Sequence, residues 1–170
     1  ALVALAAFRA LGLVDLARAF APLAPGRLLT LALCGVLMVE SFGIFRALLP
    51  EPWAVRELGR FDHLAGDTAA FLTTLATSWV FAAFGEELVH RGLLMQALTT
   101  LLGRPALALL LQAAVFGAVH LYQGPAGVLA TLITGLVFGI LVLVARGSLW
   151  PAVLAHGTAN TLALTRLWLQ

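Results

Sequence analysis

The sequence predicts an all-α protein, a polytopic transmembrane bundle of about six helices. Of its 170 residues 62% are hydrophobic and only 11% are charged, whereas soluble domains carry about 25% charged residues. The mean hydropathy is +1.02. A soluble core of this length cannot hide so much apolar surface, but a lipid bilayer can act as its solvent. Because the apolar runs are long and continuous, we expect helices rather than alternating strands.

The first two apolar segments differ in how well they fit a membrane span. Residues 2–20 include three charged side chains, which is typical of a truncated or interfacial helix. After a Pro/Gly cluster, residues 28–49 are long enough to cross a bilayer. Glu40 lies within this second helix. We expect it to pair with Arg46 or with a polar group on another helix rather than to line a site.

A polar stretch and a very long apolar run follow. Residues 50–67 hold most of the acidic side chains that lie outside the helices, so we expect a polar interfacial loop there. The next run, 68–102, exceeds one membrane thickness at 1.5 Å per residue. This excess length predicts tilt, a kink near Gly85 or a break near Gly92.

The last three helices are predicted at residues 106–122, at 127–145 and from Trp150 onwards. The middle one carries no charge, and we assign it no chemistry. Its Gly135 and Gly139 are four residues apart and predict a face that packs closely against another helix. The last helix opens with a proline, which suits a first helical turn.

One short stretch of the third helix concentrates Glu86, Glu87, His90 and Arg91. Ionisable groups at membrane depth cost about 3 kcal/mol each on insertion scales, so they persist mainly where they pair, line a wet cavity or carry chemistry. On a helix Glu87 and Arg91 share a face in the order that favours an ion pair, and Glu86 and His90 form a second pair. The stretch is therefore a candidate functional site.

Two further helices carry polar groups at helical spacing. His120 lies one turn after Phe116, and His156 lies one turn before Asn160. Two histidines and a carboxylate from separate helices can polarise a water molecule or bind a metal, and a His–Asn pair can donate two hydrogen bonds to an oxyanion. We therefore place the candidate site between the third, fourth and last helices.

These residues form three motifs in order. Glu-Glu-x-x-x-Arg, Phe-x-x-x-His and His-x-x-x-Asn occur at Glu86–Arg91, Phe116–His120 and His156–Asn160, with Ser148–Pro151 as a lead-in. Together they resemble the CAAX-protease and bacteriocin-processing family of intramembrane peptidases, called CPBP or Abi. The resemblance spans about residues 67–165, which we take as the catalytic core of a single membrane-embedded domain, 1–170. The chain departs from the family at His90, where an aromatic or aliphatic residue is more usual.

The resemblance implies an intramembrane endopeptidase that hydrolyses a peptide bond of a membrane-associated protein or peptide. It implies that Glu86 and His120 activate a water molecule, and that His156 and Asn160 stabilise the tetrahedral oxyanion. Glu87 and Arg91 would support the site structurally. His90 is a further candidate whose role the resemblance leaves open.

The resemblance leaves metal dependence open, because both metalloprotease and metal-free glutamate mechanisms are proposed for such enzymes. We favour no cofactor. A zinc version would use Glu86, His120 and His156 as its three protein ligands.

The motifs also predict an offset between helices. Along ideal helices Glu86 and His120 lie roughly 20–25 Å from the side of the Gly103 and Gly147 loops, but His156 lies only about 10 Å from it. The three side chains can meet only if the helices are staggered, either because the last helix begins below the surface or because the long helix tilts. We therefore predict that the Gly147 loop is sunk into the bundle.

Other functions remain as alternatives. A non-catalytic membrane binding or immunity protein, or a small transporter, could use the same buried polar cluster. A carboxylate-bridged metal oxidase is suggested by Glu87-x-x-His90, but such bundles need two of these elements and only one is present.

The composition also indicates the protein's source and its location in the cell. The ten positive residues are all arginines and are scattered singly, so nucleic-acid binding is not indicated. Arginine without lysine, with abundant Ala and Leu, favours a bacterial source and a multi-pass protein of the inner (cytoplasmic) membrane. We expect lipid and a peptide substrate as partners, the substrate being a leader, a prenylated tail or a C-terminal anchor.

Overall fold

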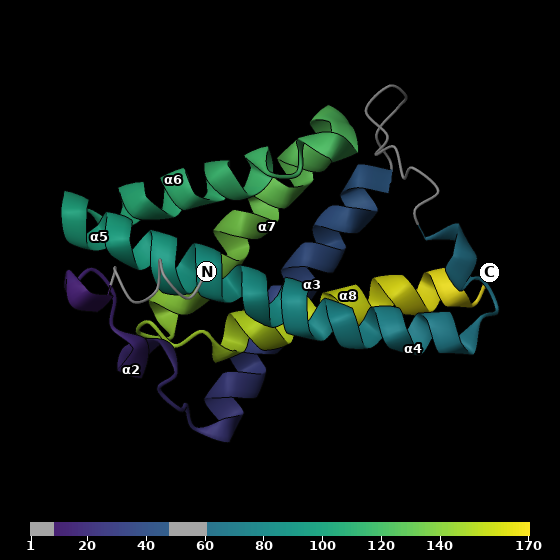
Figure 1. Cartoon of the computed structure of the whole chain (residues 1–170), viewed down its shortest axis with the longest axis horizontal. Helices are drawn as coiled ribbons and strands as arrows, with labels where there is room; N and C mark the ends of the chain where they lie inside the picture. Colours follow the sequence, from purple (N-terminus) through teal and green to yellow (C-terminus); the bar gives the residue numbers. More distant parts are fainter. Residues whose placement is uncertain (1–8, 48–60) are drawn as a thin grey trace.

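The computed structural model describes residues 9–47 and 61–170, which form helices joined by turns and short irregular segments (Figure 1). The helices are α2 Leu16–Ala19, α3 Pro25–Ala47, one long helix, α6 Pro105–Ala118, α7 Gly124–Val144 and α8 Trp150–Trp168. The long helix runs through α4 Thr68–Thr77, η2 Ser78–Glu86, η3 Leu88–Met95 and α5 Gln96–Leu102. Short 3-10 turns are η1 Asp62–Leu64 and η4 Leu121–Gln123. The predicted fold class, an all-α bundle of about six helices, is confirmed.

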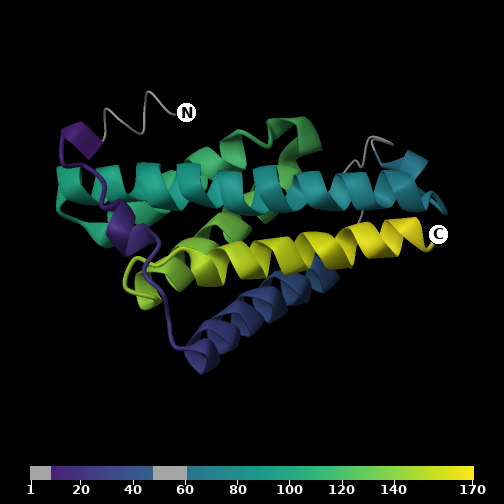
Figure 2. The ribbon, with the colours of Figure 1, turned by 60° about the horizontal axis from the view of Figure 1, so that its bottom comes forward.

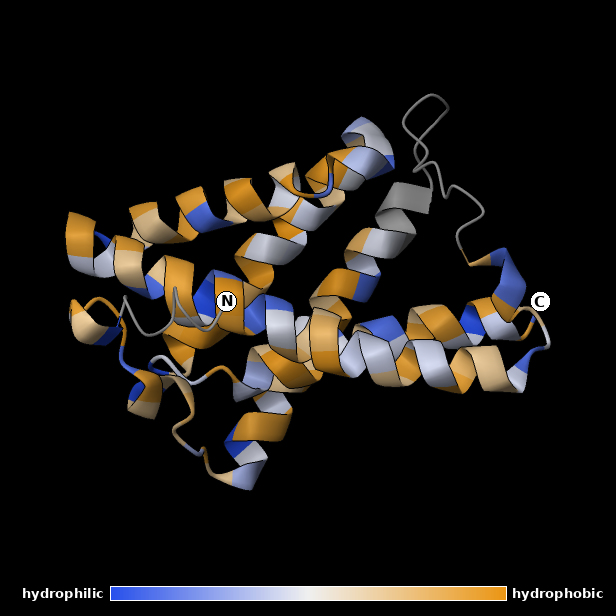
Figure 3. Cartoon of the chain, in the orientation of Figure 1, coloured by the Kyte–Doolittle hydropathy of each residue, from blue (hydrophilic) through white to orange (hydrophobic). Residues whose placement is uncertain are grey.

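Three stretches of the described chain are long and apolar enough to cross a membrane: Pro25–Gly43, Thr68–Leu102 and Leu121–Val144. α6 is apolar but shorter. Large apolar side chains such as Leu33, Leu110 and Ile140 are exposed, and Figure 3 shows hydrophobic residues over most of α6 and α7. In a bilayer such faces contact lipid, which agrees with the membrane bundle predicted from composition.

Three predicted segments lie partly outside the described residues, one of them the helix predicted at 28–49, whose last two residues are not described. Residues 1–8 of the first hydrophobic segment are also not described, and the described remainder of that segment contains the short helix α2. Of the polar loop at 50–67, only residues 61–67 are described. Within them Asp67 caps the long helix, because its Oδ1 accepts a hydrogen bond from the Ala70 N–H at 2.9 Å.

The long helix and α8 lie side by side and run in opposite directions (Figure 2). At the chain's C-terminal end the Gly66 N–H donates to the Trp168 carbonyl at 3.0 Å. The rings of Phe71 and Trp168 stack there with centroids 5.1 Å apart. The two helices that carry Glu86 and His156 are therefore direct neighbours.

The remaining helices pack around this pair. α7 packs on α6 through Gly135 and Gly139, because a Cβ at either position would press on α6 side chains or backbone, so the predicted close-packing face is confirmed. α3 crosses α7 and α8 on the other side. Arg166 of α8 donates to Glu40 at 2.6 Å. The expectation that Glu40 pairs with another helix is thus confirmed.

α8 begins below the end of the long helix, as the motif positions require. Gly92 lies against Leu149, since a Cβ there would come within 3.1 Å of Leu149 Cδ1. Because Gly92 precedes Leu102 by ten residues, the start of α8 is offset from that end by about 15 Å. Ser148 and Leu149 are each only 1% exposed. The Gly147 loop is therefore sunk into the bundle, as predicted.

The N-terminal segment 13–22 covers this buried helix start. The Leu149 N–H donates to the Ala19 carbonyl at 2.9 Å, and the Ser148 hydroxyl donates to the Ala21 carbonyl at 2.7 Å. On its other side the segment is tied to α5, where the Thr100 hydroxyl donates to the Leu13 carbonyl at 3.3 Å. These bonds satisfy backbone groups that would otherwise be buried without partners.

The long helix changes its winding instead of breaking. It is continuous through Gly85 and Gly92, so the predicted break near Gly92 is absent and Figure 2 shows it nearly straight. Between Ser78 and Met95 it has the wider turns of a π-helix. Turns of this kind are rare and occur frequently at functional sites. The charged stretch lies within this wide part.

The contact between Gly157 and Trp79 gives a stability test. A Cβ at Gly157 would overlap the rigid indole of Trp79, so Gly157→Ala is expected to destabilise the protein by about 1–3 kcal/mol. Thermal unfolding in detergent measures this change. Gly26→Ala is the control, since nothing lies within 4 Å of its added Cβ, and it should shift stability by less than about 0.5 kcal/mol. Equal effects of the two substitutions would contradict the packing described.

Candidate active site

The Glu87 carboxylate joins two helices at the centre of the bundle. Its Oε1 accepts a hydrogen bond from Arg91 Nη1 at 2.9 Å and another from His156 Nδ1 at 2.9 Å. Glu87 and Arg91 are fully buried, and His156 is 8% exposed. The ion pair predicted from the i,i+4 spacing is present. Its contact with His156 links the first motif directly to the third.

Arg91 is held by groups from two further helices. Its Nη2 donates to the Gly135 carbonyl of α7 at 3.1 Å, and Gln112 of α6 donates to the same oxygen at 3.0 Å. The guanidinium also lies over the rings of Phe116, at 4.5 Å, and Phe138, at 5.7 Å. Carboxylate, carbonyl and ring faces together offset part of the desolvation of this buried cation, whose Nε has no hydrogen-bond partner among the described residues.

Glu86 is the neighbouring carboxylate and lies closer to the surface. It is half-buried and within electrostatic range of His120 and His156, as well as of Glu87 and Arg91. Among the described residues no direct hydrogen bond joins Glu86 to either ring. The structure thus brings the candidate carboxyl of the first motif near the histidines of the other two.

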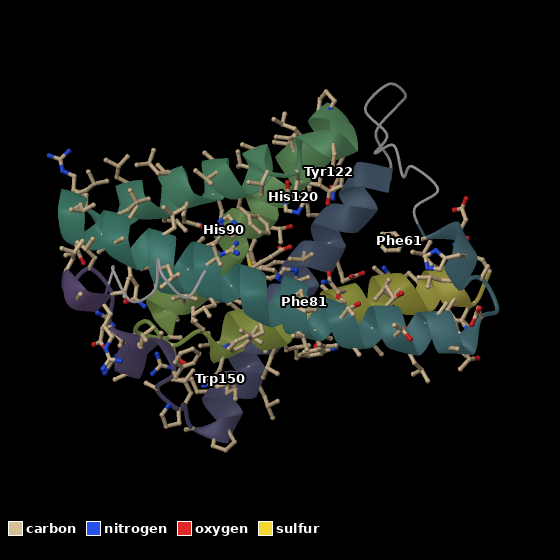
Figure 4. All side chains as sticks on the ribbon, viewed as in Figure 1. Phe61, Phe81, His90, His120, Tyr122 and Trp150 are labelled. Carbon is tan, nitrogen blue, oxygen red and sulfur yellow. The ribbon has the colours of Figure 1, made fainter. Side chains whose placement is uncertain are left out.

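His120 lies just beyond the end of α6, with one ring nitrogen committed to the backbone. Its Nδ1 lies 2.7 Å from the Phe116 carbonyl. A carbonyl can only accept, so Nδ1 carries the proton, and Nε2 has no hydrogen-bond partner within residues 9–47 and 61–170. The ring also packs against Phe116 and Tyr122, with centroids 4.9 and 5.7 Å away. Figure 4 shows His120 and Tyr122 together at the α6–α7 turn.

His156 and Asn160 occupy successive turns of α8. Because the Glu87 carboxylate accepts from His156 Nδ1, the free nitrogen of His156 is again Nε2. The His156 ring packs against Phe138, with centroids 5.1 Å apart. Asn160 Nδ2 donates to the Ser78 hydroxyl of the long helix at 3.0 Å. Both residues are therefore oriented by side chains of the long helix.

His90 is buried beside the cluster rather than within it. Its ring stands edge-on to Phe116 with centroids 4.9 Å apart, and it is within electrostatic range of Arg91 and His120. Its Nδ1 has no hydrogen-bond partner among the described residues. Figure 4 shows His90, His120 and Tyr122 along one diagonal from the long helix to the α6–α7 turn. His90 stays a candidate without an assigned role.

Sequence reasoning missed the part that α7 plays, and it missed Ser78 and Gln112. The Gly135 carbonyl binds Arg91, yet a backbone oxygen leaves no mark in the sequence. Gln112 did offer a signal, because it is an amide in the middle of an apolar helix. Phe138 contacts both Arg91 and His156 but is indistinguishable in sequence from lipid-facing phenylalanines.

The arrangement of the candidate ligands can be compared with what a zinc site requires. Within residues 9–47 and 61–170, no three His, Cys, Asp or Glu side chains are grouped closely enough to hold a metal ion. The set Glu86, His120 and His156 therefore does not fit a three-ligand zinc site as it stands, and we derive no chemical step through a metal.

A separate cavity lies under the N-terminal segment. Its lining includes Asp15 and Arg18 from that segment, Gln96 and Thr100 from the long helix, and Gly147. Gln96 is about 15 Å along the helix from Glu86. This cavity is therefore distinct from the candidate active site.

Removal of Arg91 should be far more damaging than removal of Gln112. Arg91→Met leaves the buried Glu87 carboxylate without its counter-charge, which is expected to cost about 3–5 kcal/mol. Gln112→Leu leaves the Gly135 carbonyl bonded to Arg91 and should cost about 1 kcal/mol or less. Thermal unfolding in detergent compares them. A Gln112→Leu loss as large as that of Arg91→Met would refute this ranking.

Comparison with known proteins supports the resemblance seen in the motifs. Neither the curated proteins nor the solved structures gave a match to the chain. A family model described as "Type II CAAX prenyl endopeptidase Rce1-like" matches residues 68–162. Because the match spans more than half of the chain and includes all three motifs, the chain belongs to this family of membrane endopeptidases.

Proposed function

We propose that the protein is an intramembrane endopeptidase that cleaves a peptide bond in a membrane-associated protein or peptide with a water molecule as nucleophile. The observation that carries this proposal is that side chains of all three motifs lie close together inside the helical bundle. Glu86 lies in electrostatic range of both His120 and His156, and Nε2 is the free nitrogen of each ring.

The first half of the reaction is the attack of water. Glu86 takes a proton from a water molecule that His120 Nε2 helps to orient by accepting a hydrogen bond. The oxygen of that water attacks the scissile carbonyl carbon, and the carbonyl oxygen becomes an oxyanion. Collapse of the tetrahedral intermediate breaks the C–N bond, and the proton on Glu86 passes to the leaving amine. Atoms and charge balance without a co-reactant.

The second requirement is stabilisation of the oxyanion. Asn160 donates through an amide N–H. His156 donates through Nε2 when its ring carries both protons, while its Nδ1–H keeps the bond to the Glu87 carboxylate that orients the ring. Glu87 and Arg91 thus support the site by holding His156, and they act on the substrate only through it.

The substrate reaches the site from the membrane. The apolar surfaces of the helices favour a peptide that is itself held in or on the bilayer. The family description favours a prenylated tail, and a leader peptide or C-terminal anchor fits the same chemistry. Each of these presents a backbone carbonyl at membrane depth.

Glu86→Gln is expected to abolish cleavage, with a loss of at least about 10²-fold, because the amide cannot take the proton of water. The variant should fold normally, since the fold-stabilising bonds involve Glu87. Single-turnover cleavage of a candidate peptide in proteoliposomes, followed by mass spectrometry, measures the rate. Glu40→Gln is the matched control, because Glu40 is a membrane-helix carboxylate paired with Arg166 away from the site.

Full activity of Glu86→Gln would overturn the mechanism. Absence of any cleaved product from the wild-type protein, alongside retained biological effect in Glu86→Gln, would favour the non-catalytic binding function instead.

A metal-free mechanism also predicts insensitivity to chelation. Purified protein treated with EDTA and then freed of it should cleave at the untreated rate, because no step passes through a metal. Elemental analysis of the same sample records bound zinc. Loss of cleavage that is restored only by added zinc would replace the metal-free version with a metal-dependent one.

A further inference from the structure

We propose that Ser78 is a positioning residue for the reaction, because it fixes the amide of Asn160 in the orientation that serves the oxyanion. This inference rests on the proposed function, in which Asn160 is an oxyanion donor. The contact that carries it is the hydrogen bond from Asn160 Nδ2 to Ser78 Oγ, at 3.0 Å.

The inventory of donors explains what this bond does. The amide nitrogen of Asn160 carries two hydrogens, and the bond to Ser78 uses one of them. The second N–H has no hydrogen-bond partner in the described part of the chain and is held in a fixed direction relative to the first. Without an acceptor at position 78 the amide would rotate, because the terminal torsion of asparagine has a broad distribution. A donor that rotates stabilises the transition state less than a donor that is already oriented.

The position of Ser78 suits this purpose. Ser78 is the first residue of the wide π-helical part of the long helix. Both Ser78 and Asn160 are half-buried, which places the bond away from bulk solvent. Below it, Glu87 holds His156 in the same manner. The long helix thus orients both proposed oxyanion donors of α8 through side-chain hydrogen bonds.

A neighbouring contact shows that Ser78 is not needed to dock the helices. Trp79 Nε1 donates to the Thr161 hydroxyl at 3.1 Å, and its ring covers Gly157. The two contacts join consecutive residues of the long helix to consecutive residues of α8. The Trp79 contact holds α8 against the long helix without touching the amide of Asn160. Loss of the Ser78 bond should therefore act on the amide more than on packing.

The experiment compares Ser78→Ala with Thr161→Val, which removes a hydrogen bond between the same two helices at the same level. Ser78→Ala is expected to lower kcat about tenfold with KM nearly unchanged. The substitution misorients the Asn160 amide, which donates to the oxyanion in the transition state and not to the bound substrate. Thr161→Val should keep the wild-type kcat. Ser78→Thr retains a hydroxyl and should restore most of the rate. Thermal unfolding of all three variants provides the stability comparison.

A double-mutant cycle with Asn160→Ala completes the test. If Ser78 acts through Asn160, adding Ser78→Ala to Asn160→Ala should cause no further loss of kcat. The inference is overturned if the two losses multiply, if Ser78→Ala and Thr161→Val lower kcat equally, or if Asn160→Ala keeps the wild-type rate. Inactive Glu86→Gln with fully active Ser78→Ala refutes this inference alone, whereas fully active Glu86→Gln refutes the proposed function.

Discussion

The buried Glu87 carboxylate is the interaction on which the rest of the structure depends. A single oxygen receives both the Arg91 guanidinium and the His156 ring, so charge balance and helix register are set by one contact. A carboxylate in this position is costly unless both partners are present. The cation in turn needs the Gly135 carbonyl and the Phe116 ring, which brings α7 and α6 into the same network. Four helices are thereby held around the candidate site.

This contact requires α8 to begin deep in the bundle. If α8 began level with the end of the long helix, His156 would lie about 15 Å from Glu87 along the bundle. The mismatch does not arise, because α8 starts just after the buried Ser148 and Leu149. Carbonyls of segment 13–22 accept hydrogen bonds from the Leu149 N–H and the Ser148 hydroxyl, so neither group is buried without a partner. The site therefore depends on a segment far from it in sequence.

Much of this arrangement could be predicted from the sequence, and the reasons differ by residue. The helices follow from long apolar runs, and the Glu87–Arg91 pair follows from its spacing. The sunken start of α8 follows from the need for Glu86 and His156 to share one depth. The bond between Glu87 and His156 could not be predicted, because it depends on how two helices cross. Ser78 gave no signal either, since threonines at nearby positions bond their own helix.

The family-matched region depends on the N-terminal segment for two hydrogen-bond acceptors. That region begins at residue 68, yet the partners of Leu149 N–H and the Ser148 hydroxyl are carbonyls at positions 19 and 21. The buried start of α8 in this chain is therefore completed by backbone from outside the matched region. Because both acceptors are main-chain carbonyls, a substitution at position 19 or 21 leaves the acceptor atom itself in place.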